Sequence, residues 1–170
     1  MKNFKSHKAL TLLEVIVAMT ILSVVSAGIV ASSIQIRRMS ESAVRENTAS
    51  SVAAGFLEQM IAIDYPVLEG YADSVANFNF AIRDGGTQPI LINDPNPSPT
   101  LRIPIGTEGV DADGNQIETS MDFWFRVRVD HTADGYRSLL ISIDYFWEDP
   151  WARRRLQRSM SLVRAAANAN

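Results

Sequence analysis

Apolar residues form one unbroken block near the start of the chain. No side chain between Val15 and Ile36 is charged, and about 20 apolar residues are enough for a helix to span a bilayer. The block begins beside a carboxylate, Glu14, and ends at Arg37-Arg38. It predicts a membrane-spanning helix over residues 10–38. An acid at the edge of hydrocarbon is costly, so Glu14 requires a partner.

The apolar residues that follow lie on one helical face only: Ala49, Val52, Ala53, Phe56, Met60 and Ile63. Charged side chains such as Glu46 and Glu58 fall on other faces. This pattern predicts that the helix continues as an amphipathic segment over residues 39–64. We expect it to end before Tyr65-Pro66, because the residue that precedes a proline avoids the helical region.

Residues 65–121 show little periodicity, and we predict a variable loop region there. Within it, short alternating runs indicate strands at residues 78–82, 89–92 and 101–105. The proline-rich run over residues 93–99 is predicted to be a loop, because proline supplies no donor to a strand ladder.

Strict alternation appears over residues 122–164. The apolar positions of three successive runs are Phe123, Phe125, Val127 and Val129, then Leu139, Ile141, Ile143, Tyr145 and Trp147, then Leu156, Met160 and Leu162. Turn sequences, Asp134-Gly135 and Glu148-Asp149-Pro150, separate the runs. We predict an antiparallel meander whose apolar face covers the amphipathic helix, with Ser142 and Asp144 facing away. The predicted fold is α+β, a long N-terminal helix packed on a C-terminal antiparallel sheet.

The residues around the start of the apolar block form a recognisable motif. A basic leader ends in Lys8-Ala9 and is followed by Leu10-Thr11-Leu12-Leu13-Glu14-Val15. This sequence resembles the N-terminus of type IV prepilin-like proteins, although Ala9 and Leu10 replace the usual glycine and phenylalanine. The resemblance implies that residues 1–9 are a leader, that a prepilin peptidase cuts between Ala9 and Leu10, and that Leu10 becomes N-methylated. It also implies that Glu14 pairs with the terminal amine of a neighbouring subunit.

Beyond the motif, the order of elements most resembles minor pilins and minor pseudopilins, in particular the I-type pseudopilin of type II secretion and the V-type minor pilin. The resemblance implies a structural subunit and not an enzyme. The implied partners are other pilin or pseudopilin subunits, the prepilin peptidase and methyltransferase, and the inner-membrane assembly platform. Two alternatives stay open: a membrane-anchored binding or adhesion module, and a minor pilin for DNA uptake. An ordinary signal peptide cut before Gly28 and a signal anchor are further alternatives.

Charge supports an oriented, exported domain. The chain has 16 lysines and arginines and 19 acidic residues, and its lysines are Lys2, Lys5 and Lys8. The positive-inside rule therefore predicts a cytoplasmic N-terminus in the bacterial inner membrane, with residues 39–170 outside the cytoplasm. Cutting after Ala9 removes all the lysines and leaves a net acidic chain, so we expect no nucleic acid among its partners. Cysteine is absent, and the domain must be stable without disulfides.

Candidate binding chemistry is sparse. Oxygen donors alternate at Asp111, Asp113 and Asn115 as in calcium loops, but the spacing departs from the EF-hand and also fits a plain hairpin turn, which we favour. The run Arg153-Arg154-Arg155, with Arg158 and Trp151, could contact DNA, protect an edge strand or meet an acidic neighbouring subunit. We expect no cofactor, with calcium the sole candidate.

Overall fold

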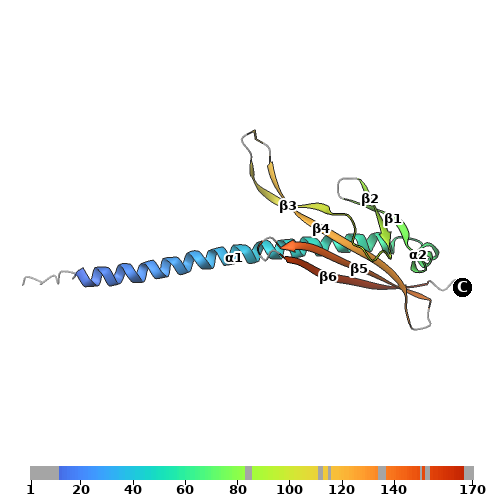
Figure 1. Cartoon of the computed structure of the whole chain (residues 1–170), viewed down its shortest axis with the longest axis horizontal. Coiled ribbons are helices and arrows are strands. Elements are labelled where there is room, and N and C mark those ends of the chain that lie inside the picture. Colours follow the sequence, from blue (N-terminus) through green and yellow to red (C-terminus); the bar gives the residue numbers. More distant parts are fainter. Residues whose placement is uncertain are drawn as a thin grey trace, which may run out of the picture. The chain divides into compact units, whose positions relative to one another are not determined.

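The computed structural model describes residues 12–82, 86–110, 113–114, 116–133, 137–149, 151 and 154–166. The chain divides into two compact units, Met1–Glu41 and Ser42–Asn170. Helix α1 (Leu12–Ile61) supplies the described residues of the first unit and continues into the second (Figure 1). The order of the other elements is α2, then six strands, which confirms the predicted α+β class of a long N-terminal helix followed by antiparallel sheets.

The part of α1 in the second unit buries one face. Ala49, Ala53, Phe56 and Met60 are buried there, and Val52 is partly buried. These residues recur at intervals of three and four, which is the repeat of a helix side facing a core. The predicted apolar face of residues 39–64 is therefore confirmed within Ser42–Asn170.

Helix α1 ends before Tyr65-Pro66, as predicted, but not because of the proline. The helix stops at Ile61, and Tyr65-Pro66 does not end it but opens a second helix, α2 (Tyr65–Ala72). Proline is tolerated in the first turn of a helix because its missing N–H would have no helical partner there. Pro66 therefore belongs to the start of α2 and does not terminate α1.

The region predicted to be a variable loop contains more regular structure than its pattern indicates. Strands β1 (Ala76–Ala81) and β2 (Thr87–Ile92) pair as an antiparallel hairpin, which confirms two of the short strands. Strand β3 (Leu101–Val110) is ten residues long and extends well beyond the predicted 101–105. Its sequence is rich in glycine and weakly alternating, and pairing with β4 (Gln116–His131) keeps it extended.

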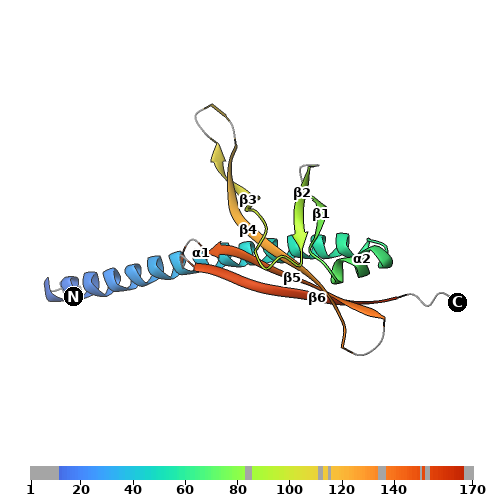
Figure 2. The same ribbon diagram turned by 45° about the vertical axis from the view of Figure 1, so that its right-hand side comes forward.

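The main sheet has four antiparallel strands in the order β3-β4-β5-β6, with β5 at Ser138–Asp149 and β6 at Arg154–Ala165. The predicted meander is confirmed, and β3 adds a fourth strand. Strand β4 is staggered: Gln116–Phe123 pair with β3 and Phe123–His131 pair with β5. The β3–β4 hairpin therefore projects from the rest of the sheet (Figure 2). Register shifts after Pro104 and Thr107 mark bulges in this projection.

The proline-rich loop covers the edge of β4 that β3 leaves open. Asn93 N donates to Val127 O at 2.9 Å, and Ser98 N donates to Phe125 O at 2.7 Å. The Asn93 side chain adds bonds to Val129 N at 2.8 Å and to Val129 O at 3.2 Å. Asn93 has a φ of 62°, a left-handed conformation that asparagine tolerates better than most residues. The loop thus satisfies backbone groups that an uncovered strand edge would leave unpaired.

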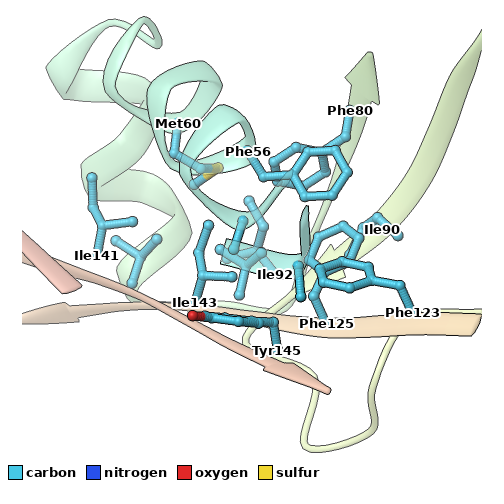
Figure 3. Packing of buried hydrophobic residues seen from close by; sticks show 14 of the residues in the cluster. Phe56, Met60, Phe80, Ile90, Ile92, Phe123, Phe125, Ile141, Ile143 and Tyr145 are labelled. Atoms are coloured by element: carbon cyan, nitrogen blue, oxygen red, sulfur yellow. The ribbon is translucent and has the colours of Figure 1, made fainter. Parts of the chain in front are cut away.

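Aromatic rings fill the core between α1 and the strands (Figure 3). Phe56 stacks on Phe125 with ring centroids 4.4 Å apart and meets the edge of Phe80 at 5.3 Å. Phe80 in turn meets Phe125 edge-on at 5.4 Å. Offset and edge-to-face contacts of this kind stabilise a core beyond the apolar area they bury. Helix α1, the β1–β2 hairpin and the main sheet are thereby joined through three rings.

Candidate membrane and assembly segment

The first unit consists, in its described part, of α1 residues 12–41. Every side chain from Leu12 to Ser40 is exposed, including large apolar residues such as Leu22 and Ile29. By length and composition, the helix can cross a membrane. An exposed apolar surface of this extent is unusual on a soluble protein and is typical of a membrane or protein interface.

Three hydroxyl groups within the apolar segment, those of Thr20, Ser23 and Ser33, are satisfied by the helix itself. Thr20 donates to Ile16 O at 2.8 Å, Ser23 to Met19 O at 2.8 Å, and Ser33 to Ile29 O at 2.9 Å. Each bond runs to the carbonyl four residues earlier, so no outside partner is needed. Unpaired polar groups are costly in an apolar surrounding, and these bonds make Thr20, Ser23 and Ser33 compatible with lipid.

Glu14 lies in the first described turn of α1 and is exposed. A carboxylate at this end of a helix interacts favourably with the positive end of the helix dipole. The predicted cleavage residues, Ala9 and Leu10, lie outside the described residues. The structure therefore places Glu14 on the apolar helix, and the pairing with a neighbour's amine stays a prediction.

The other end of the segment is polar. Arg37 Nε donates to Glu41 Oε1 at 3.0 Å, one helical turn away. Such exposed pairs contribute only a few tenths of a kcal/mol. Their position matters more, because Arg37 and Glu41 end the stretch of α1 that has no charge after Glu14.

The calcium candidate falls at the tip of the β3–β4 hairpin. Asp111 and Asn115 lie outside the described residues, and Asp113 is exposed. Val110 pairs with Gln116, and Gly114 has a φ of +88°, so Asp113 and Gly114 lie between the paired ends of β3 and β4. Among the residues that the structure describes, no three His, Cys, Asp or Glu side chains form a metal-binding group. Calcium binding stays an untested prediction.

The arginine-rich segment is divided among different contacts. Arg153 lies outside the described residues. The Arg155 guanidinium lies 4.4 Å from the ring centroid of Trp124, and Arg158 Nη2 lies 3.1 Å from Glu46 Oε1. Trp151 is half exposed. These arginines therefore help to attach β6 to β4 and α1, a use that the sequence pattern did not indicate.

Asp144 is a buried charge that sequence analysis missed. It lies on the face of β5 opposite α1, as predicted, but its side chain is only 5% exposed. Its Oδ2 accepts from Arg126 Nη2 at 2.7 Å and from Arg128 Nη2 at 3.0 Å. Burial alone would raise the pKa of Asp144, but hydrogen bonds from Arg126 and Ser159 and the charge of Arg128 outweigh it and hold the pKa below its usual value.

Comparison with known proteins identifies the N-terminal segment. Residues 4–30 match the family model described as the prokaryotic N-terminal methylation motif. The match includes Ala9, Leu10 and Glu14, and its later part lies in the exposed apolar helix. The chain thus has a type IV prepilin-like N-terminus. No curated protein and no solved structure matches the chain.

Proposed function

We propose that this chain, whose N-terminus is type IV prepilin-like, is a structural subunit of a type IV pilus or type II secretion filament, as a minor pilin or pseudopilin. The observation that carries the proposal is the methylation motif at residues 4–30, continuous with an apolar helix whose side chains are all exposed from Leu12 to Ser40. Such a helix can be held by lipid before assembly and by other helices after it.

In this proposal, a prepilin peptidase cuts between Ala9 and Leu10 and the new amine of Leu10 is methylated. The partners are other pilin or pseudopilin subunits, the peptidase and the assembly platform of the inner membrane. The lysines of the leader favour a cytoplasmic N-terminus, which places residues 39–170 in the periplasm or outside the cell.

Glu14 would set the register between subunits. Moving an apolar helix from lipid to a bundle of helices gains little from the hydrophobic effect, because lipid tails are as apolar as leucine. A carboxylate in this setting strongly favours pairing with a cation. The amine at Leu10 of a neighbour is such a cation, and it can reach Glu14 at only one axial offset between the two helices.

The first test is the mass of the mature N-terminal peptide, isolated from the native membrane fraction. We expect a peptide that begins at N-methylated Leu10. A peptide that begins at Gly28 would mean an ordinary signal peptide, and one that begins at Met1 would mean a signal anchor. Either of these two results would contradict the proposed function.

A further inference from the structure

A groove of about 570 Å³ lies beside the free edge of β3. One wall is the face of α1 that carries Val52 and Gly55, and the other wall consists of four consecutive β3 residues, 101–104. Successive side chains of a strand point to opposite faces, so a groove that touches all four follows the edge of the strand. In the order β3-β4-β5-β6, β3 has no partner strand on this side within the described sheet. The groove therefore leaves room beside an unpaired strand edge.

Strand β6 is the opposite edge of the same sheet. It pairs with β5 at every residue of Arg154–Ala165 without a register shift, and its sequence contains no proline. Strand β3 differs, because it contains Pro104 and two register shifts. Bulges and prolines are common ways to keep an edge strand from pairing with another chain. The free edge of β6 has neither.

The contacts of β6 with α1 fix its direction. Arg158 Nη2 lies 3.1 Å from Glu46 Oε1, and Arg164 donates to Ile61 O at 2.7 Å. Residue numbers rise together in these two contacts, so β6 and this part of α1 run the same way. Two β6 strands joined antiparallel about a two-fold axis would point their helices in opposite directions. That pairing does not suit subunits that leave one membrane with their helices parallel.

The β6 edge of one copy and the β3 edge of another do suit parallel helices. The pairings β3–β4, β4–β5 and β5–β6 are all antiparallel, so β3 runs antiparallel to β6. When two copies have the same orientation, β6 of one copy lies antiparallel to β3 of the other. Both copies then keep α1 on the same face of the joined sheet.

Apolar side chains select a register for this pair. Leu101 and Ile103 are partly buried on the α1 side of β3. On the same side of β6, Met160 and Leu162 are half-buried, and the described core includes Met160 but not Leu162. Pairing Leu101 with Leu162 of a second copy also brings Ile103 opposite Met160. Directly opposed apolar side chains stabilise a strand pair, and this register gives two such pairs.

We propose that the β6 edge of one copy enters the groove of a second copy and pairs with β3 as an added strand. Backbone hydrogen bonds hold such a strand, and side chains at alternate positions set its register. Because Pro104 cannot donate, the added ladder is short and centres on residues 101–103. The contact is heterologous, and its repetition without closure produces an open array. This inference rests on the proposed function, which supplies copies with parallel helices.

The chain has no cysteine, so engineered cysteines report directly on the contact. In the proposed register Arg102 lies opposite Ser161 of the second copy, and opposed Cβ atoms are about 4.5–5.5 Å apart. Within one chain the two positions lie on opposite sheet edges, at least about 14 Å apart, which is too far for a disulfide. The test oxidises the full chain, with Arg102→Cys and Ser161→Cys, in native membranes. We expect a ladder of multimers, which neither single variant forms.

The matched control combines Arg102→Cys with Gln157→Cys. Gln157 is exposed on the same face of β6 and is about 14 Å from Ser161 along the strand, so we expect no ladder. A control ladder as strong as that of the test pair would overturn the proposed pairing. Dimers from Ser161→Cys alone that match the double variant would indicate a β6–β6 pair and would also overturn it.

A substitution in the apolar register tests the cause. In the Arg102→Cys, Ser161→Cys background, Leu162→Asp should remove most of the ladder, because it places a carboxylate against Leu101, and Leu162→Ile should keep it. An undiminished ladder with Leu162→Asp, or a cross-link to a different protein, would contradict the proposal. If the chain is cut and methylated at Leu10 but forms no ladder, this inference fails alone. If the mature chain begins at Gly28 or Met1 and forms no ladder, the proposed function fails with it.

Discussion

At the scale of single residues, Glu14 is the residue on which the proposed assembly depends most directly. It is the one acidic residue of α1 before Glu41, and it stands in the first described turn. Its carboxylate lies at the positive end of the α1 dipole. In the proposed function, this carboxylate on an apolar helix pairs with the amine of a neighbouring subunit, and that makes its substitution informative.

We expect Glu14→Ala and Glu14→Gln to be cut and methylated normally but to enter filaments at least about tenfold less, because losing about 1.4 kcal/mol of pairing is a factor of ten. The measurement is the ratio of filament-associated to membrane chain. Glu41→Ala is the matched control, because its exposed pair with Arg37 contributes little. Normal incorporation of Glu14→Ala would rule out the pairing.

Asn93 combines a hydrogen-bonding side chain with a left-handed backbone conformation. Its amide bonds Val129 N, Val129 O and Tyr71 O, and its φ is positive. We expect Asn93→Ala to lower the free energy of unfolding by about 3 kcal/mol, from lost hydrogen bonds and an unfavourable φ. Asn93→Gly keeps the backbone conformation and should cost about 2 kcal/mol. Denaturant titration of both variants in detergent separates the two causes. If both variants lose the same free energy of unfolding, the positive φ of Asn93 makes no contribution to stability.

The pKa of Asp144 makes a prediction about pH. Because its folded-state pKa lies below its unfolded value, its carboxylate stabilises the fold above about pH 4, and this contribution is lost as the pH falls through the folded pKa. As the pH is lowered below about 4, the ordinary pKa of an aspartate, we expect the free energy of unfolding to fall more steeply in the wild type than in Asp144→Asn. Asp144→Asn itself should cost about 2 kcal/mol near neutrality. Parallel pH profiles would show that Asp144 is not responsible.

At the scale of elements, the end of α1 depends on a distant strand. The last turn of α1 contains no basic residue, and its terminal carbonyls are bonded instead by Arg164 of β6. The Arg164 guanidinium donates to Ile61 O at 2.7 Å and also to Ile63 O. A cation at this end of a helix is favourable both as a hydrogen-bond donor and toward the dipole.

We therefore expect Arg164→Ala to destabilise the fold by about 1–2 kcal/mol. Arg164→Lys should recover part of the loss, because it keeps the charge but not the geometry of the guanidinium. Arg102→Ala is a suitable control, since Arg102 is 79% exposed and lies 3.9 Å from Asp122. The free energy of unfolding of all three variants is measured by denaturant titration. If Arg164→Ala is as stable as Arg102→Ala, Arg164 does not stabilise the end of α1.

Elements with strong periodicity were predictable, and weakly periodic ones were not. The buried face of α1 and the three strands of the meander follow from apolar spacing, because half-buried elements repeat at 3.6 or 2 residues. Helix α2 was missed because Pro66 is equally compatible with a helix end and a helix start. The length of β3 was missed because its glycines and Pro104 lower strand propensity, while pairing with β4 overrides it.

At the scale of the whole molecule, the two units differ in how their apolar side chains are covered. The second unit buries its apolar side chains in its own core, from Ala49 to Trp147. The first unit leaves its apolar side chains exposed from Leu12 onward, so the surroundings must cover them. Lipid can cover such a helix in a single chain, and neighbouring helices could cover it in the proposed filament, because lipid tails and apolar side chains are about equally apolar.

The sequence by itself determined the prepilin-like N-terminus, the apolar helix and the alternating face of the meander. All of these are local patterns, read from neighbours within a few turns or strand repeats. Only the tertiary structure decided the burial of Asp144, the covering of β4 by Asn93, the capping of α1 by Arg164 and the stagger of β4 between β3 and β5. Each of these depends on residues tens of positions apart coming together, and no local pattern records which distant partner a polar side chain will meet.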